Sequence, residues 1–107
     1  MKVLKPQTLS LGDGCEFIGT VVHELGHALG LYHEHQRSDR DNYINVYGKN
    51  VAAGLIHGFN KTDPVDELKL VKYDYTSIMH YGEYDFSKQA EDHGGQRWKD
   101  ETSRTLR

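Results

Sequence analysis

The feature that most constrains this chain is the string H-E-L-G-H at residues 23–27, which fits the H-E-x-x-H pattern. Residues four apart on a helix lie about 40° from each other around its axis, so both imidazoles can reach one metal ion from successive turns. Glu24 is rotated about 100° from His23, outside the ligand set but near enough to hydrogen-bond a metal-bound water. Two neutral nitrogens that hold zinc, and a carboxylate that takes a proton from its water, suit metal-assisted hydrolysis.

A third histidine extends this pattern. Gly30 follows His27 by three residues and His33 follows Gly30 by three, which fits the long metzincin motif. In a continuous helix His33 would lie about 600° beyond His27, on the wrong side for a shared metal. Glycine permits a positive φ, so Gly30 can end the helix and turn the chain back until His33 closes the site. The spacing therefore predicts a zinc site and not a set of solvated histidines.

Further motifs indicate a family. His33 is followed by Glu34 and then by H-Q-R-S-D-R-D, which resembles the astacin signature H-E-x-x-R-x-D-R-D. Residues 77–81, S-I-M-H-Y, are similar to that family's Met-turn, and G-x-G-C at residues 12–15 also matches. The resemblance runs from about Gln7 to Lys88. It implies a zinc metalloendopeptidase that hydrolyses peptide bonds in protein or peptide substrates.

The resemblance also implies roles for single residues. Three histidines look like the ligands of one Zn²⁺ per chain: His23, His27 and His33. Glu24 looks like the general base. Tyr81 resembles a tyrosine that is a distant fifth zinc ligand in the resting enzyme and then swings away to help stabilise the oxyanion. Met79 would lie beneath the zinc as a hydrophobic platform.

Two charged features keep more than one interpretation. In the family the residue at Glu34 interacts through water with the N-terminal ammonium; the alternative here is an ion pair with Arg37 or Arg40. The run from Arg37 to Asp41 is interpreted as a salt-bridged corner, with a solvated loop as the alternative. His57 and His93 stand alone in the sequence, and no functional role is predicted for them.

Local patterns predict an α+β fold, a zincin-like catalytic core that is truncated, with an active-site helix, a Met-turn and little sheet. Apolar residues at three- and four-residue spacing predict a helix from about Cys15 to Leu29, ended by Gly30 in a left-handed conformation. A short strand is predicted at residues 7–11, a turn at 12–14 and an extended segment at 43–47. A charged loop is expected at 36–42, a helical turn within 50–57 and a short helix from Pro64 to about Leu70.

The organisation expected along the chain is a partial catalytic domain at residues 1–88 and a divergent, polar, poorly ordered tail at residues 89–107. By the resemblance, the sheet with the edge strand that pairs with substrate is missing. The alternative function is therefore a non-catalytic zinc-binding fragment of such an enzyme. Cys15 is the single cysteine and resembles a family cysteine whose disulfide partner lies upstream, so no internal disulfide can form.

Composition excludes several partners. Lys and Arg number 13 against 16 Asp and Glu, a net charge of −3, which gives no basic surface for nucleic acid. No apolar run approaches the roughly 18–20 residues of a membrane span. The first residues lack the apolar core of a signal peptide, although the resemblance implies a secreted protein. A structural zinc site is disfavoured because such sites usually have four protein ligands.

Overall fold

The computed structural model describes residues 5–85 and 96–98. The chain divides into two compact units, residues 1–32 and residues 33–107, and each is described by itself.

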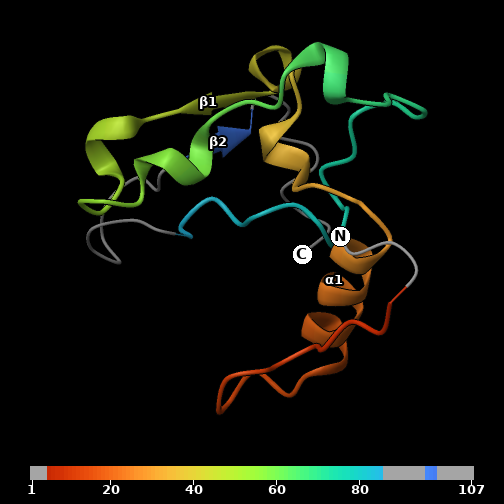
Figure 1. The fold of residues 1–107 in the computed structure, drawn as a ribbon. Coiled ribbons are helices and arrows are strands. Elements are labelled where there is room, and N and C mark those ends of the chain that lie inside the picture. The colour runs from red at the N-terminus through yellow and green to blue at the C-terminus, as the bar shows by residue number, and fades with distance from the viewer. Residues whose placement is uncertain (1–4, 86–95, 99–107) are drawn as a thin grey trace. The chain divides into compact units, whose positions relative to one another are not determined.

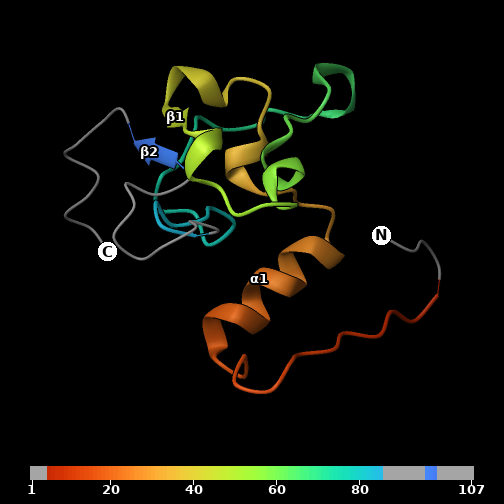
Figure 2. The ribbon, with the colours of Figure 1, turned by 90° about the vertical axis from the view of Figure 1, so that its left-hand side faces the viewer.

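The described part of the first unit, residues 5–32, contains one helix, α1 (Ile18–Ala28), which is unbroken in both views of the ribbon (Figures 1 and 2). The turn predicted before it is confirmed, since the amide of Cys15 donates to the Gly12 carbonyl at 3.0 Å. The strand predicted at residues 7–11 is wrong: these residues are irregular. A strand needs a neighbour to accept and donate its backbone hydrogen bonds, and no described segment pairs with this one.

The end of α1 follows the predicted glycine stop. Gly30 has φ 95°, a left-handed value that side chains with a Cβ rarely adopt. Its amide donates to the His27 carbonyl at 3.0 Å, and the amide of Leu31 donates to the Gly26 carbonyl at 3.0 Å. This pair of bonds is a Schellman motif, which satisfies carbonyls at the helix end and reverses the chain.

The second unit is built from short 3₁₀ turns and two short strands. Strand β1 (Ile44–Val46) confirms the predicted extended segment and pairs antiparallel with β2 (Gln96–Trp98), beside it in Figure 1, with Ile44 opposite Trp98. Five 3₁₀ helices occur in the described part of this unit: Glu34–Gln36, Arg40–Asn42, Gly48–Asn50, Ile56–Phe59 and Pro64–Asp66.

Several expectations for this unit need correction. The charged loop expected at 36–42 also contains the 3₁₀ helix Arg40–Asn42. The helical turn predicted within 50–57 begins only at Ile56. The helix that begins at Pro64 ends at Asp66 and not near Leu70, because Leu68 and Leu70 are 86% and 84% exposed and no apolar burial rewards its extension. The predicted tail, 89–107, lies outside the described residues except for β2.

The core of the second unit is small and aromatic. Among residues 33–85, five hydrophobic side chains are buried: Ile44, Val51, Phe59, Tyr73 and Met79. The rings of Tyr43 and Tyr73 stack with centroids 4.4 Å apart and planes 7° apart. Tyr75 donates its hydroxyl to the Tyr43 carbonyl at 2.8 Å, so the phenol that joins this core has its polar end satisfied. Within the described residues, no helix combines the length and apolar character needed to cross a membrane.

Candidate metal centre

The two histidines of α1 lie next to each other, as their spacing predicts. The ring centroids of His23 and His27 are 4.8 Å apart and the rings meet edge to face. Both side chains are half-buried, and Glu24, the next residue after His23, is half-buried as well.

The backbone fixes which nitrogen of His27 carries a proton. Its Nδ1 lies 2.8 Å from the carbonyl oxygen of Leu31. A carbonyl can only accept, so Nδ1 is the donor and Nε2 keeps its lone pair for a metal. The Schellman turn at Gly30 brings this carbonyl back to the ring. Gly30 therefore helps to orient the His27 ring in addition to ending the helix.

The third histidine begins the second unit. Nδ1 of His33 lies 3.2 Å from Oε1 of Gln36. Together the three histidines, each half-buried, form a group of described side chains able to hold a metal ion: His23, His27 and His33. Three neutral imidazoles are a donor set that suits zinc with one coordination position left open. This histidine set fits the expected zinc cofactor.

Tyr81 packs against the third histidine. Its ring centroid is 4.3 Å from that of His33 and 4.4 Å from that of His35. The preceding Met-turn is closed by the amide of His80, which donates to the Ser77 carbonyl at 2.9 Å. Met79 is 4% exposed, so it is a buried apolar side chain as expected, and its place beneath a zinc ion remains a prediction.

Glu34 connects the segment after His33 to the Met-turn. Its amide donates to the Met79 carbonyl at 2.9 Å. Its Oε1 accepts from the amide of Asp74 at 2.9 Å and from Nη1 of Arg37 at 3.1 Å. Burial raises the pKa of Glu34, although both donors favour the charged form. Of the two ion-pair partners considered for Glu34, the structure selects Arg37 and not Arg40.

The salt-bridged corner predicted at residues 37–41 is confirmed. Arg37 donates to both oxygens of Asp39, from Nε at 3.0 Å and from Nη2 at 2.9 Å. These hydrogen bonds hold the pKa of Asp39 below its usual range. Arg40 is 8% exposed and pairs with Asp41 at 2.8 Å, and Lys61 reaches the other oxygen of Asp41 at 2.7 Å.

Sequence reasoning missed two buried histidine contacts. His35 is 0% exposed, and its Nε2 donates to the carbonyl of Gly58 at 2.9 Å. Burial lowers the pKa of His35 to about 4, so the ring is neutral near pH 7. The hydroxyl of Tyr73 lies 2.7 Å from Nε2 of His80. The His35 partner is 23 residues away in the chain, so no local pattern could have indicated it.

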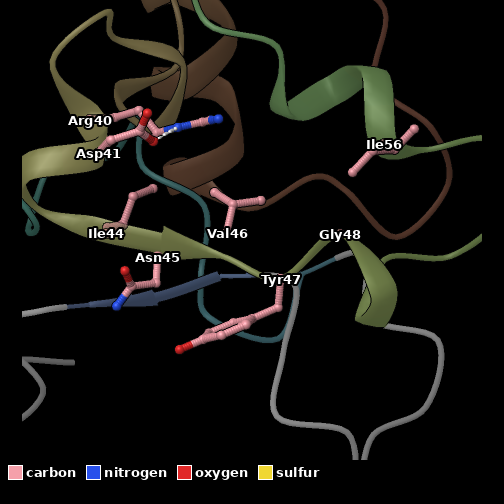
Figure 3. Close-up of a pocket in the computed structure, with 8 residues that line it drawn as sticks. All are labelled: Arg40, Asp41, Ile44, Asn45, Val46, Tyr47, Gly48 and Ile56. Atoms are coloured by element: carbon pink, nitrogen blue, oxygen red, sulfur yellow. Dashed lines mark hydrogen bonds and ion pairs between the residues drawn. The ribbon is translucent and has the colours of Figure 1, made fainter.

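The second unit also has a hollow beside strand β1. It is an open depression of about 720 Å³. Figure 3 shows its lining, with the Arg40–Asp41 ion pair at one corner: Arg40, Asp41, Ile44, Asn45, Val46, Tyr47, Gly48 and Ile56. None of the predicted site residues lines it. Of the remaining features, Cys15 is an exposed free thiol and His57 is exposed, while His93 lies outside the described residues.

Comparison with known proteins gives one consistent answer. Residues 2–103 match the family model described as Astacin, a peptidase family. Astacin-like metalloprotease toxin 5 of Loxosceles gaucho is 45% identical over 86% of this chain and 51% of its own length. Blastula protease 10 of Paracentrotus lividus is 51% identical over 76% of this chain and 14% of its own.

The solved structure of high choriolytic enzyme 1, a hatching enzyme zinc-protease from the medaka Oryzias latipes, matches with a TM-score of 0.75 and 39% identity. The match covers 81% of this chain and 42% of that chain. This neighbour confirms the expected zincin-like α+β core with one helix and little sheet. The chain thus spans about half the length of the toxin and less than half of the hatching enzyme chain. The family match extends past Lys88, where the resemblance was expected to end. Together with the histidine motif and the Met-turn, these matches show that the chain belongs to the astacin family of peptidases.

Proposed function

We propose that this chain contributes the zinc centre of a metalloendopeptidase that hydrolyses peptide bonds. The observation that carries the proposal is the group of three histidines able to hold a metal ion, in a chain of the astacin family. The H-E-x-x-H string supplies Glu24 beside two of these histidines, and Tyr81 packs on the third.

The proposed zinc ligands are His23, His27 and His33, with Tyr81 as a distant fifth. Nδ1 of His27 faces a carbonyl, which supports metal binding through Nε2. When bound, zinc supplies a Lewis acid for a carbonyl oxygen and lowers the pKa of a coordinated water to about 7. Among the described residues the set offers three strong protein ligands and not four, which favours a catalytic over a structural role.

Glu24 is proposed as the general base. It follows His23 directly on α1, rotated about 100° around the axis, so its carboxylate lies beside the ligand face and not within it. It accepts the proton of the attacking water and passes it to the leaving amine. A positioned acid–base group of this kind contributes roughly 10²–10⁴ in rate.

Tyr81 is proposed as a hydrogen-bond donor to the oxygen that becomes negatively charged in the tetrahedral intermediate. Its ring lies 4.3 Å from that of His33, which supports a place at the edge of the ligand set. Removing one donor of this type costs roughly 10²–10³ in kcat. The Tyr81→Phe variant is therefore expected to lose turnover and to keep its metal.

Substrates are proposed to be proteins or peptides outside the cell. The names of the relatives support this: one is a metalloprotease toxin and another is a hatching enzyme. An acidic chain of net charge −3 supports protein over nucleic-acid partners.

One observation favours a second candidate function. The chain spans 51% of the toxin and 42% of the hatching enzyme chain. A peptidase positions its substrate largely through main-chain hydrogen bonds to a strand edge, and the described part of this chain has only the β1–β2 pair. The alternative is a non-catalytic fragment that binds zinc and does not cleave.

Cleavage of a fluorescence-quenched peptide distinguishes the enzyme from the non-catalytic zinc-binding fragment. The 107-residue chain loaded with zinc is compared with Glu24→Gln and with Glu16→Gln, a matched change at an exposed position just before α1. The enzyme predicts cleavage that a chelator abolishes, that Glu24→Gln lowers at least about 10²-fold and that Glu16→Gln leaves unchanged. Bound zinc without chelator-sensitive cleavage would establish the fragment instead.

A further inference from the structure

We propose that Gln36 and His35 are positioning residues for His33, and that the carbonyl of Gly58 is their shared anchor. Gln36 sets which ring nitrogen of His33 carries the proton, and His35 sets the plane of that ring. The inference rests on the proposed role of His33 as a zinc ligand and adds the residues that prepare it.

The tautomer of His33 follows from a chain of two hydrogen bonds. Gln36 donates from Nε2 to the Gly58 carbonyl at 3.1 Å. Because a carbonyl only accepts, the amide nitrogen of Gln36 must face Gly58 and its Oε1 must face His33, at 3.2 Å from Nδ1. Oε1 also only accepts, so Nδ1 of His33 carries the proton. Nε2 is then left with the lone pair that a metal requires.

The plane of the His33 ring is constrained by a stack of aromatic rings. The centroid of His35 is 5.4 Å from that of His33 with the planes 27° apart, and 4.4 Å from that of Tyr81 with the planes 26° apart. The ring centroid of Phe59 lies 5.3 Å from that of His35, with the planes 60° apart. His35 is 0% exposed and is held by its own bond to Gly58, so it cannot turn freely. His35 therefore limits how the rings of His33 and Tyr81, which the proposed function uses, can move.

The segment that carries the Gly58 carbonyl is itself held in place by Arg40. The buried guanidinium of Arg40 donates from Nη1 to the carbonyl of His35 at 3.0 Å and to the carbonyl of Phe59 at 2.7 Å. This clamps the segment that contains Gly58 to the segment that follows His33. The Gly58 carbonyl, which accepts from both Gln36 and His35, is therefore fixed relative to the ring that it controls.

Removing a partner that orients a metal-bound histidine typically weakens metal binding about 10- to 100-fold. The loss arises because an unheld imidazole must first adopt the right tautomer and plane. A role confined to stability would change the free energy of unfolding and leave the tautomer of the folded protein unchanged.

The first test reads the tautomer in the metal-free 107-residue chain. Long-range ¹H–¹⁵N NMR at about pH 8, above the usual histidine pKa of about 6.5, distinguishes protonated from bare ring nitrogens. We expect His33 with its proton on Nδ1, and we expect Gln36→Met to populate the Nε2-protonated form. Asn45→Met places the same side chain at an exposed position of β1 and should leave His33 unchanged. A wild-type His33 protonated on Nε2 overturns the proposal, and this measurement needs no folded variant.

The second test measures zinc affinity by competition with a chelating dye. We expect Gln36→Met to bind zinc about 10- to 100-fold more weakly than the wild type. His35→Phe keeps the stacked ring and loses the bond to Gly58, whereas His35→Leu loses both. The expected order of affinity is wild type, then His35→Phe, then His35→Leu. Variants that bind zinc within about twofold of the wild type would overturn the proposal, since that is far below the effect of a lost orienting partner.

These readouts separate the inference from the proposed function. A chain that binds zinc and does not cleave peptide defeats the enzyme, while the tautomer and the order of affinities still decide the role of Gln36 and His35. A chain that cleaves, with variants unchanged in both readouts, keeps the enzyme and defeats the positioning role.

Discussion

Helix α1 and the segment after it stabilise their histidines in different ways. Along α1 three apolar side chains are exposed: Ile18 by 84%, Val22 by 45% and Leu25 by 50%. Only Gly26 of this helix is buried, and the helix has no side-chain cap at its N-terminus. From His33 to Tyr81, by contrast, buried rings and a buried arginine hold each other through contacts between residues far apart in the chain.

This difference indicates which interactions hold the histidines of α1 in place and which hold His33. The 11 residues of α1 are fewer than the roughly 12–15 that an isolated helix needs to be stable in water, so the helix is marginal on its own. Among the described contacts, the surroundings of His27 are ordered by the backbone turn at Gly30, which brings the Leu31 carbonyl to its ring. The segment around His33 depends on tertiary contacts. Changes to the core should therefore disturb the surroundings of His33, and changes to the backbone should disturb those of His27.

The largest effect expected is from the core of the second unit. Ile44 is 1% exposed, and Ile44→Ala should lower the free energy of unfolding by about 3 kcal/mol, through lost burial and the cavity left behind. Val22 on α1 is 45% exposed, and Val22→Ala should change that free energy by less than about 0.5 kcal/mol. Urea titration followed by tyrosine fluorescence measures both. Equal losses of unfolding free energy in the two variants would contradict the proposed difference between the two units.

Arg40 should come next. Arg40→Met removes two hydrogen bonds from a buried guanidinium to the carbonyls of His35 and Phe59, and we expect a loss of about 2 kcal/mol in the free energy of unfolding. Lys61→Met is the control, because it removes one exposed ion pair with Asp41 and should cost less than about 1 kcal/mol. Native-state hydrogen exchange should show the loss in residues 33–85 and little change in α1. A loss of protection confined to α1 would contradict the claim that Arg40 stabilises the second unit.

The backbone signal of α1 is tested at Gly30. At φ 95°, Gly30→Ala forces an alanine into left-handed space at a cost of roughly 1–2 kcal/mol. The strain should fall on the turn that brings the Leu31 carbonyl to His27. Circular dichroism should show reduced helix content, and the zinc affinity should fall with it. Helicity and affinity that both match the wild type would mean that the turn is not needed.

The smallest effect concerns acid pH. Hydrogen bonds from Arg37 lower the pKa of Asp39 below its ordinary 3.8. A lowered carboxyl pKa contributes stability that is present above the unfolded pKa and lost as pH falls through the folded one. The wild type should therefore lose somewhat more stability below about pH 4 than Asp39→Asn, by under about 1 kcal/mol. Parallel curves of unfolding free energy against pH would show that this pair contributes nothing.

The sequence allowed the local features to be predicted and missed the distant ones. The helix, its stop at Gly30 and the partner histidines follow from spacing within the short run from His23 to His33. The strand at residues 7–11 failed because alternation shows only a tendency, and a strand also needs a neighbour that the described chain does not supply.

The surroundings of His33 could be predicted only in part. Its motif and Tyr81 were recognisable, and so was the charged corner at residues 37–41. The anchoring of His35 and Gln36 on Gly58 was not, because it joins residues 22 and 23 positions apart through a carbonyl that every residue carries. A hydrogen bond to a backbone carbonyl cannot be predicted from residue types, so these contacts around the site are identified only from the folded structure.

The most direct test of the account is the zinc content of the purified 107-residue chain, measured by native mass spectrometry for the wild type and for His33→Ala. We expect one zinc per wild-type chain, removed by a chelator, and a large loss of zinc in His33→Ala. His57→Ala, at an exposed histidine with no proposed role, should keep its zinc. A wild-type chain without stoichiometric zinc, or one whose zinc survives the loss of His33, would contradict the central claim.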